Sequence, residues 1–345
     1  MRVSDFDYDL PAELIAQHPL SERDASRMLI VDRATQTWRD STFASLPDCL
    51  RPNDVLVLNN TRVFPARLLG ERAPSGGAVE LLLLRELQPN VWSALARPAR
   101  RLRTGTQISF CGGELRAEVI ESLADGVRVL RFESEKPLNV VIDEIGRTPL
   151  PPYIKREGEQ SSADGERYQT VYAKERGAIA APTAGLHFTP RVLQAIEARG
   201  VRLAEITLHV GYGTFEPVRA KVISEHRVAP EWFSIDDEAA RVMNRARVAG
   251  GRIIAIGTTT ARALESSVRA EGQIEARSGF ADLTIIPGYR FRAVDALLTN
   301  FHLPRSSLLM LVSAFAGRGS IIAAYEYAVR QRYRFYSFGD CMLIL

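Results

Sequence analysis

Four short stretches of the chain combine hydroxyl and histidine side chains at points where a strand should end. They read "APTAGLHFTP", "LHVGYGTFEP", "IGTTTARALES" and "TNFHLPRSS". In α/β sheets, ligands collect at the carboxyl ends of strands, where unpaired N–H groups and helix dipoles point. Neutral histidines and hydroxyls can move protons and donate hydrogen bonds near pH 7. The clustering of four such junctions therefore indicates a ligand site, although each junction alone means little.

The first stretch places Thr183, Gly185 and His187 directly before a helix start. Thr189 is a good N-cap residue and Pro190 suits the first helical turn. A histidine beside leucine and phenylalanine is often a packed structural residue, so the local pattern also allows that interpretation of His187. Thr183 and Gly185 contribute nothing to the cap, and glycine permits close approach of the backbone to another group. The stretch therefore indicates either a ligand wall or a well-packed helix start.

The third stretch predicts an anion site. Gly257 ends an apolar strand, and Thr258 and Thr259 open a helix that also carries Arg262. A carboxylate or phosphate could bind to the free N–H groups and to the guanidinium. A capped helix with a solvent-facing Arg262 explains the pattern equally well. The spacing matches neither the G-x-G-x-x-G nor the G-x-x-x-x-G-K-[ST] nucleotide signature.

Clusters of basic residues provide candidate contacts for nucleic acid. Arginines interleaved with aromatic rings can hold phosphates and stack bases. A basic helix end and ordinary aromatic packing in a strand are the alternatives. A weaker candidate is "RQRYRFYSF" near the C-terminus. The main candidates are Arg97, Arg100, Arg101 and Arg103 in "RPARRLR", with Lys155 and Arg156 in "YIKR".

Composition indicates a folded protein without a bound metal. The chain has 345 residues, 46% of them hydrophobic and 25% charged, and a net charge of +3. These values lie near the averages for folded domains, and no apolar run is long enough to span a bilayer. The three cysteines lie far apart, and the five histidines show no metal-ligand spacing. We therefore expect a cytoplasmic protein with no metal and no membrane partner.

The four polar stretches require a layered α/β domain to position them. Strand candidates such as "VRLAEITLHVG" and "RIIAIG" alternate with helix candidates, including a short one at 11–17. Between Val63 and Glu133, six short strand-like segments separated by Gly-rich turns predict a small antiparallel barrel or sandwich. The expected fold is α/β (α+β multidomain), with 1–62 and 149–345 as a discontinuous α/β catalytic domain and 63–148 as an inserted β-barrel domain. The polar segment 157–166 is expected to be a mobile loop.

Taken together, the motifs resemble those of one family. The matching stretches include "LIAQHPLSERDASRMLIVDR", "DVLVLNNTRVFPARLLG", "GAIAAPTAGLHFT", "LHVGYGTFEPV", "IGTTTARALES", "LTNFHLPRSSLLMLVSAFAG" and "YRFYSFGDCMLIL". They span nearly the whole chain, and so many ordered motifs are more specific than any one of them. The chain is similar to the S-adenosylmethionine:tRNA ribosyltransferase-isomerases of the queuosine pathway.

This resemblance implies a reaction. Members of the family transfer and isomerise the ribosyl part of S-adenosylmethionine onto 7-aminomethyl-7-deazaguanine at the wobble position of tRNA. The product is epoxyqueuosine, and adenine and methionine are released. S-adenosylmethionine is consumed as a co-substrate, and no metal or other cofactor is implied. The basic clusters then become candidate tRNA contacts, and we expect a monomer.

The resemblance also implies roles for particular residues. The expected catalytic residues are His187, His209 and His302, without a decision on which is the general base. Arg23, Asp24 and Arg27 are expected to bind the methionine end of the donor or the tRNA. The full set of expected substrate-binding residues is Arg23, Asp24, Arg27, Asn59, Asn60, Thr61, Arg62, Thr183, Gly185, Thr258, Thr259 and Arg262.

The chain departs from the family pattern at a few positions. Ala229 and Pro230 stand where a histidine and a serine are usual, which leaves His226 and Glu231 as the matching polar residues. Tyr327 replaces a usual histidine, and Ser307 replaces a threonine. Of these positions, Ser307 lies in one of the four junctions, at the end of "TNFHLPRSS", and the others lie outside them.

Two other functions remain open from the sequence. An S-adenosylmethionine-dependent RNA methyltransferase would use the same donor, but the N-terminal half lacks the strand, Gly-rich turn and helix unit that such enzymes need. A non-catalytic RNA-binding protein would explain the arginine clusters and leave the four polar junctions without a role.

Overall fold

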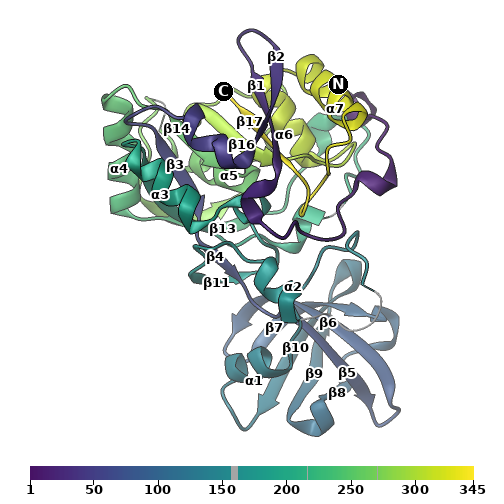
Figure 1. Ribbon diagram of the computed structural model, residues 1–345. Coiled ribbons are helices and arrows are strands. Elements are labelled where there is room, and N and C mark those ends of the chain that lie inside the picture. Colours follow the sequence, from purple (N-terminus) through teal and green to yellow (C-terminus); the bar gives the residue numbers. More distant parts are fainter. Residues whose placement is uncertain (157–161, 216, 270) are drawn as a thin grey trace.

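A large mixed sheet forms the centre of the upper lobe in Figure 1. The computed structural model describes residues 1–156, 162–215, 217–269 and 271–345. Within these ranges nine strands pair in the order β15-β13-β12-β3-β14-β16-β17-β1-β2. They are β1 Arg27–Asp32, β2 Thr37–Thr42, β3 Val55–Asn59, β12 Arg202–Leu208, β13 Glu231–Ile235, β14 Ile253–Ile256, β15 Arg277–Ala281, β16 Ala296–Asn300 and β17 Cys341–Ile344.

The strand directions decide where the polar stretches lie. The central strands β12, β3, β14 and β16 are parallel, whereas β17 is antiparallel to β16. Every residue of β3 and β14 is buried, as expected for parallel strands that are covered on both faces. The ends of the four parallel strands meet at one edge of the sheet, which we call the carboxyl edge. The chain segment just before β17 lies at the same edge, because β17 runs the opposite way.

Helices cover both faces of this sheet (Figure 1). Val55 and Val57 of β3 point into one hydrophobic core, and Leu56 and Leu58 into a second core on the other face. This alternation is the period of two that a strand imposes on its side chains. The helix α3 Pro190–Ala198 packs into the second core. The helices that pack into the first core are α4 Asp237–Val248, α5 Thr258–Ser267, α6 Ser307–Ala316 and α7 Arg318–Arg330.

The lower lobe is a closed antiparallel barrel. Its six strands all lie in a fully described part of the chain, and they close in the order β10-β7-β6-β5-β8-β9. The short helix α1 Leu138–Ile145 packs Leu138, Val141 and Ile142 against the barrel core. The six strand-like segments expected from the sequence are therefore confirmed, and so is the α/β fold with a barrel. The strands are β5 Arg67–Ala73, β6 Gly77–Gln88, β7 Val91–Arg97, β8 Gln107–Phe110, β9 Leu115–Ser122 and β10 Val127–Ser134.

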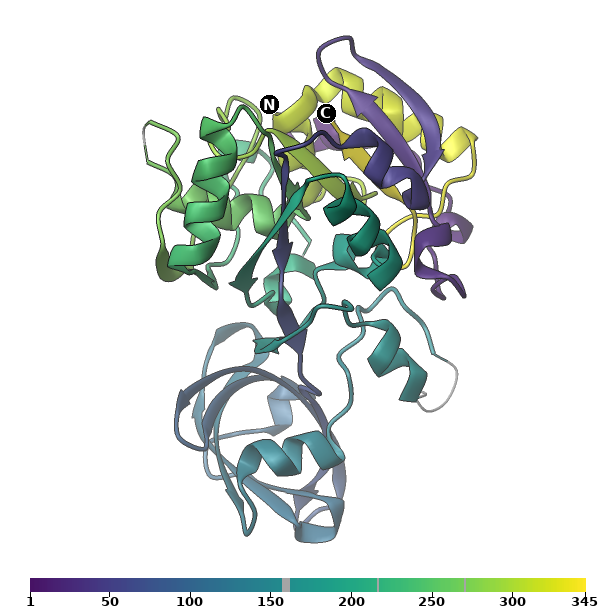
Figure 2. The same ribbon diagram turned by 60° about the vertical axis from the view of Figure 1, so that its left-hand side comes forward.

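Two crossings of the chain connect the lobes, as Figure 2 shows. β4 Thr61–Val63 leads from β3 toward the barrel, and β11 Glu175–Ala178 leads back. The two strands pair in parallel, so the entry to the barrel and the exit from it lie side by side. His209, which follows β12, sits against this pair through Thr61 and Gly177.

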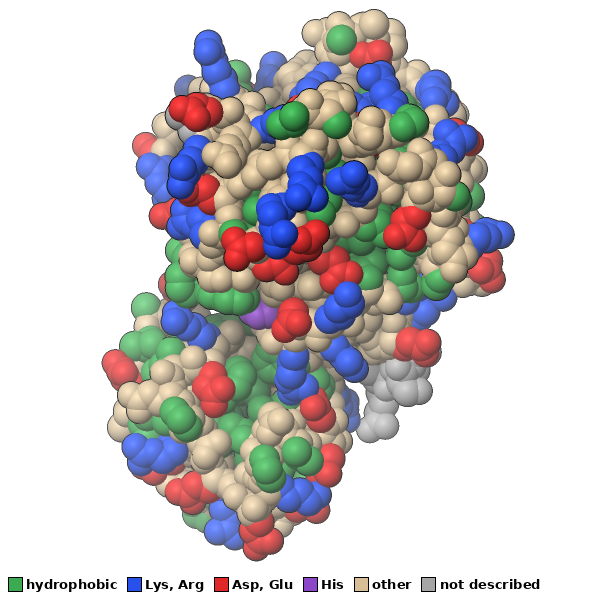
Figure 3. Space-filling model, turned by 90° about the vertical axis from the view of Figure 1, so that its left-hand side faces the viewer, with side chains coloured by type: hydrophobic (Ala, Val, Ile, Leu, Met, Phe, Trp, Pro, Cys, Tyr) green, Lys and Arg blue, Asp and Glu red, His purple; other side chains and the backbone are tan. Residues whose placement is uncertain are grey.

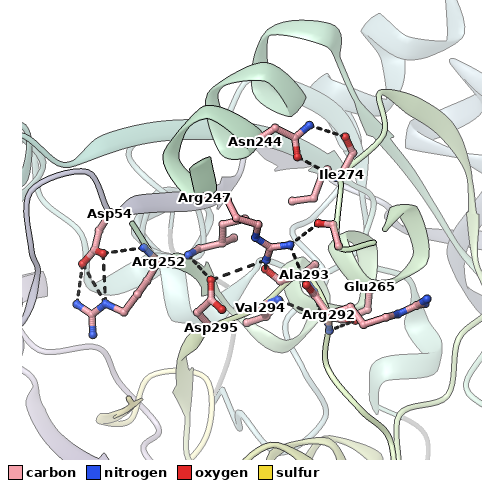
Figure 4. A network of polar contacts seen from close by, with 12 residues as sticks. Asp54, Asn244, Arg247, Arg252, Glu265, Ile274, Arg292, Ala293, Val294 and Asp295 are labelled. Atoms are coloured by element: carbon pink, nitrogen blue, oxygen red, sulfur yellow. Dashed lines mark hydrogen bonds and ion pairs between the residues drawn. The ribbon is translucent and has the colours of Figure 1, made fainter. Parts of the chain in front are cut away.

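A polar network ties the loops at the opposite edge of the sheet (Figure 4). The buried carboxylate of Asp54, just before β3, accepts hydrogen bonds from the backbone and side chain of Arg252, just before β14. Asp295, just before β16, accepts from the backbone N–H of Ile253 at 2.8 Å. Burial raises the pKa of Asp54, but the bonds from Arg252 outweigh it and leave that pKa below its ordinary value. These contacts fix the amino ends of three central strands.

Three local expectations differ from the structure. The helix expected at 11–17 is a 3₁₀ turn, Ala12–Leu14, because Ile15 instead bridges to Phe335. The helix α7 begins after Gly317 rather than at Ser320. Of the segment expected to be a mobile loop, 157–161 lies outside the described residues, and α2 Ser162–Arg167 is helical.

No single helix in the described ranges is both long and apolar enough to cross a membrane; α6 and α7 meet that test only as a pair bent by 116°.

Candidate active site at the carboxyl edge

The four polar junctions meet at a small cavity at the carboxyl edge. The cavity has a volume of about 50 Å³, and we call it the threonine cavity. Two residues before β17 also line it, because β17 reverses direction next to β16. The lining residues are Ala180–Ala184 from the first junction, Val210 from the second, Gly257, Thr258 and Thr259 from the third, Thr299, Asn300, His302 and Leu308 from the fourth, and Tyr336 and Ser337.

The start of α5 forms one wall of the threonine cavity. Gly257 has a φ of +97°, a conformation that favours glycine, and within the described chain no side chain caps this helix start. The first backbone N–H groups of a helix have no intrahelical partner. Thr260 turns its hydroxyl back to Ile256 O at 2.7 Å, whereas Thr258 and Thr259 line the cavity. This wall therefore presents N–H groups and the positive end of a helix dipole.

His302 is a buried wall of the same cavity. Its Nε2 lies 2.8 Å from Thr299 Oγ1, and its backbone N–H donates to the Tyr325 hydroxyl at 3.2 Å. The Tyr8 hydroxyl donates to the His302 carbonyl. Burial lowers the pKa of His302 to about 3, so the ring is neutral near pH 7.

His187 does not line the threonine cavity. It faces an adjoining cavity of about 20 Å³, which shares Ser337 with the first. Its Nδ1 lies 2.8 Å from Ser26 Oγ and its Nε2 lies 3.3 Å from Asn300 Nδ2. Burial, followed by the charges of Arg23 and Arg334, lowers the pKa of His187 to about 3. Both ring nitrogens thus have partners within the protein.

His209 lies in a larger groove between the two lobes, visible as the hollow in Figure 3. The groove has a volume of about 840 Å³ and shares Val210 with the threonine cavity. The His209 ring stacks on Trp232 with centroids 5.0 Å apart, and its Nδ1 lies 2.8 Å from Thr61 Oγ1. Burial lowers the pKa of His209 below its ordinary value, despite the nearby Glu175 carboxylate. The ring is half-buried, so a ligand in the groove can reach it.

Gly177 allows this packing. A Cβ at Gly177 would lie 2.5 Å from His209 Nε2, which no side chain could tolerate without moving the ring. The glycine therefore fixes how closely the β4–β11 pair approaches the histidine.

The asparagines expected to bind substrate have structural partners instead. Asn59 is buried and bonds both the N–H and the carbonyl of Leu208, which ties β3 to β12. Asn60 donates to Glu205 and accepts from Thr207. The Thr61 hydroxyl contacts His209, and Arg62 is exposed. Of these four residues, Thr61 contacts an expected catalytic residue, His209.

Arg23, Asp24 and Arg27 are dispersed. Arg23 lines the small cavity beside His187 and donates to Leu186 O at 3.1 Å. Asp24 is buried and paired with Arg191, with N–O 2.8 Å. Arg27 lies 3.6 Å above the Tyr333 ring and pairs with Asp40. Asp24 and Arg27 therefore anchor structure rather than line these cavities.

The expected anion contact of Arg262 is not supported by its position. The guanidinium is buried, and it donates to the Glu231 carboxylate and to the carbonyls of Leu283 and Ala281. Glu231 also accepts the Gly211 N–H at 2.9 Å. The side chain is neither solvent-facing nor part of the threonine cavity, because it clamps α5 onto β13 and β15.

The expected role of Gly185 also needs correction. A Cβ at this position would lie 2.2 Å from the Tyr172 hydroxyl and 2.7 Å from Thr170 Cγ2. The group that approaches the Gly185 backbone so closely is thus Tyr172, and not a ligand. Thr183, two residues earlier, does line the threonine cavity.

The basic clusters divide into exposed and paired residues. Arg156 forms an ion pair with Asp164 of α2, with N–O 2.7 Å, and it donates to Gln17 O at 2.9 Å. A second groove of about 440 Å³ at the lobe junction is lined by Arg156 together with Arg67, Arg97 and Arg147. The exposed members of the expected set are Arg97, Arg100, Arg101, Arg103 and Lys155.

Several residues at these cavities were not singled out from the sequence. Asn300 lies in the motif "TNFHLP" and lines the threonine cavity. The motif also contains Thr299 and His302, which are more common catalytic residue types and drew attention away from the asparagine. Trp232 and Phe280 line the groove, and Ser337 reaches the threonine cavity through the reversal of β17, next to Tyr336 of the weaker nucleic-acid candidate "RQRYRFYSF". Near the positions that depart from the family pattern, His226 Nε2 lies 2.7 Å from Ser307 Oγ. Among the described residues, no group of three or more His, Cys, Asp or Glu could hold a metal ion.

Comparisons with known proteins agree with this architecture. The model of a family described as queuosine biosynthesis protein matches residues 3–344. A crystal structure of an S-adenosylmethionine tRNA ribosyltransferase from Thermotoga maritima is 38% identical in sequence and has a TM-score of 0.56. The match covers 99% of this chain and 100% of that protein. The chain therefore belongs to the queuosine biosynthesis protein family.

Proposed function

We propose that this protein transfers and isomerises the ribosyl part of S-adenosylmethionine onto 7-aminomethyl-7-deazaguanine at the wobble position of tRNA. Adenine and methionine leave, and epoxyqueuosine is formed. The 38% identity to the Thermotoga maritima ribosyltransferase, over the whole chain, supports this donor and this class of acceptor. The enzyme works as a cytoplasmic monomer, and it needs no metal or cofactor besides the donor.

The observation that carries the proposal is a pair of neighbouring spaces at the carboxyl edge, which share the lining residue Val210. The groove of about 840 Å³ is large enough for a nucleoside, and the threonine cavity of about 50 Å³ adjoins it at Val210. A donor that extends from one to the other places its sulfonium and ribosyl carbons beside His209. Aromatic side chains in the groove, Trp232 and the half-exposed Phe280, can stack on a base taken out of the anticodon loop.

His209 is the general base in this proposal. The Thr61 hydroxyl donates to Glu175 O at 3.4 Å, so its oxygen accepts the Nδ1–H of His209 at 2.8 Å. This tautomer leaves the lone pair on Nε2 for a substrate proton. The lowered pKa keeps the ring neutral near pH 7, which is the form a base requires.

The base starts the reaction at the carbon next to the sulfonium. His209 removes a proton from the ribosyl carbon that carries sulfur, where the positive charge acidifies the C–H bond. Adenine leaves with the electron pair of its glycosidic bond and takes up a proton, and the amine of the modified base gives up a proton as it bonds to a carbon of the rearranging ribosyl group. An oxygen of that group then attacks the carbon that carries sulfur and closes the epoxide, and methionine leaves with the electron pair of the broken C–S bond. Each bond shift needs hydrogen bonds to ring oxygens, which hydroxyls at the carboxyl edge can supply.

The tRNA backbone binds to the exposed arginines of the barrel. Arg97 ends β7 and lines the second groove together with Arg147, and Arg100, Arg101 and Arg103 follow it in the chain. Exposed guanidinium groups release counterions when they bind phosphates, so tRNA affinity should fall as salt rises. Arg156 is excluded from this set because its charge is paired with Asp164.

The test is a product analysis. The protein is incubated with S-adenosylmethionine and tRNA that carries 7-aminomethyl-7-deazaguanine, and the small molecules are identified by mass. Adenine and methionine in equal amounts, with epoxyqueuosine in the tRNA, would support ribosyl transfer with isomerisation. S-adenosylhomocysteine would instead show a methyltransferase, and tRNA binding without any product would favour a binding protein. The His209→Ala variant is the matched control, since it should bind tRNA and release adenine at least about 100-fold more slowly.

A further inference from the structure

One buried acceptor lacks a partner, and it belongs to a residue that lines the threonine cavity. Asn300 is 3% exposed, and its Oδ1 has no hydrogen bond to any residue that the structure describes. Its Nδ2 donates to Tyr336 O at 3.0 Å and lies 3.3 Å from His187 Nε2. Turning the amide over would bring Oδ1 against the Tyr336 carbonyl, so that two acceptors face each other. The amide orientation is therefore fixed, and Oδ1 is left for a donor that the protein does not supply.

His187 holds this amide in place. Because His187 Nε2 accepts from Asn300, its Nδ1 carries the proton and donates to Ser26 Oγ at 2.8 Å. The Ser26 hydroxyl in turn donates to Arg23 O at 3.2 Å. In this series of hydrogen bonds, from Arg23 O to Asn300, every polar group has a partner except Asn300 Oδ1. His187 thus positions Asn300, and it lines the adjoining small cavity rather than the threonine cavity.

Asn300 Oδ1 is an acceptor that lacks a donor, whereas the start of α5 has donors that lack an acceptor. This helix of ten residues begins at Thr258 with free N–H groups and no side-chain cap in the described chain. Thr258, Thr259 and Thr260 are all buried, so water competes poorly for these N–H groups. Such a helix start favours an anion. The cavity thus offers donors for a negative group on one wall and an acceptor for a positive or N–H group on another.

We propose that the threonine cavity binds the amino-acid end of S-adenosylmethionine, with its carboxylate at the start of α5 and its ammonium donating to Asn300 Oδ1. This rests on the proposed function and adds the subsite and the contacts. A volume of about 50 Å³ fits a small polar group and is too small for a nucleoside. An α-amino acid head group carries both complementary charges on one carbon. The rest of the donor then extends past Val210 into the groove, where His209 lies.

The test compares two ligands that differ in the amino-acid end. S-adenosylhomocysteine keeps that end and does not react, whereas 5′-methylthioadenosine lacks it. Calorimetry on the protein should show that Asn300→Ala lowers the affinity for S-adenosylhomocysteine about 10- to 100-fold, because a charge-assisted hydrogen bond is lost. The affinity for 5′-methylthioadenosine should change less than about threefold. Asn244→Ala removes a matched amide at the opposite edge, where it bonds Ile274, and should leave both affinities unchanged.

Each outcome decides the assignment. Equal losses for both ligands, or no loss for either, would overturn the subsite and leave the ribosyltransferase proposal intact. If the wild-type protein bound neither ligand nor S-adenosylmethionine, both proposals would fail. Circular dichroism spectra of Asn300→Ala and of the isosteric Asn300→Asp check that both variants are folded. The Asp side chain keeps an acceptor but loses the N–H group that donates to Tyr336 O.

Steady-state kinetics distinguish a positioning role of His187 from a role as the general base. His187→Gln should raise the KM for S-adenosylmethionine about tenfold, with kcat within a factor of three and the acid limb of the pH–rate profile unchanged. A large fall in kcat at unchanged KM would show that His187 contributes to the chemical step, and would overturn this assignment.

Discussion

The buried ion pair between Arg262 and Glu231 allows a quantitative prediction. Both side chains are about as buried as core residues, at 4% and 5% exposed, and their closest N–O distance is 2.6 Å. In Arg262→Ala, the Glu231 carboxylate loses its cation, and the carbonyls of Ala281 and Leu283 lose their donors. Removing one member of a buried pair costs about 3–5 kcal/mol. We expect the lower end, about 3 kcal/mol, because Gly211 still donates to Glu231 and the groove lets water approach it.

Thermal unfolding followed by circular dichroism measures this loss. About 3 kcal/mol corresponds to a fall in Tm of roughly 6–12 °C. Arg241→Ala is the matched control, because Arg241 also lies on a helix and pairs with Glu238, but both are well exposed at 60% and 67%. An exposed pair contributes little, so the control should shift Tm by less than about 2 °C.

A double variant tests the physical reasoning directly. Arg262→Met with Glu231→Leu removes both charges and keeps apolar volume, so it should recover much of the stability lost in Arg262→Ala. The reasoning is refuted if Arg262→Ala unfolds within 2 °C of wild type, or if the double variant is no more stable than the single one.

Three further predictions concern the histidines and Gly185. His209→Ala should lower kcat by about 10²- to 10⁴-fold with an unchanged Tm, and adenine release over time checks this. His187 and His302 have pKa values of about 3 in the folded protein and near 6.5 when unfolded, so the unfolded chain binds more protons between these pH values. The stability they confer is complete above pH 6.5 and is lost as pH falls toward 3, by about 1.4 kcal/mol per pH unit for each; a plot of Tm against pH should flatten in His302→Gln. Gly185→Ala should destabilise by about 1–3 kcal/mol, since its Cβ would lie 2.2 Å from the Tyr172 hydroxyl. Adding Tyr172→Phe should restore part of that loss, and denaturant unfolding would show whether it does.

Local patterns predicted much of the fold. The barrel strands are neighbours in sequence and mostly pair with neighbours, so short apolar runs and Gly-rich turns were enough to find them. The meeting of the four junctions also followed from sequence, because buried apolar strands alternating with helices indicate a parallel sheet whose carboxyl ends share an edge. The family resemblance predicted that Thr183, Thr258 and Thr259 bind substrate, and all three line the threonine cavity.

Long-range partners could not be predicted in this way. The sequence around Arg262 suggests an anion site, but a buried Glu231 from another strand takes its charge. Glycine at 185 indicates a close approach without saying that Tyr172 makes it. Asn300 has a role only because His187 and Tyr336 come to the same place, and Tyr336 does so through the antiparallel pairing of β17.

The paired crossings β4 and β11 have a consequence for how the chain folds. β3 ends at Asn59 and β12 begins at Arg202, so their pairing must close a very long loop. Closing a loop costs entropy that grows with the number of flexible residues. The barrel pairs strands that are close in sequence, and once formed it brings β4 and β11 together. We expect the barrel to form early and to shorten the loop that the main sheet has left to close, so that destabilising the barrel core slows the assembly of the main sheet.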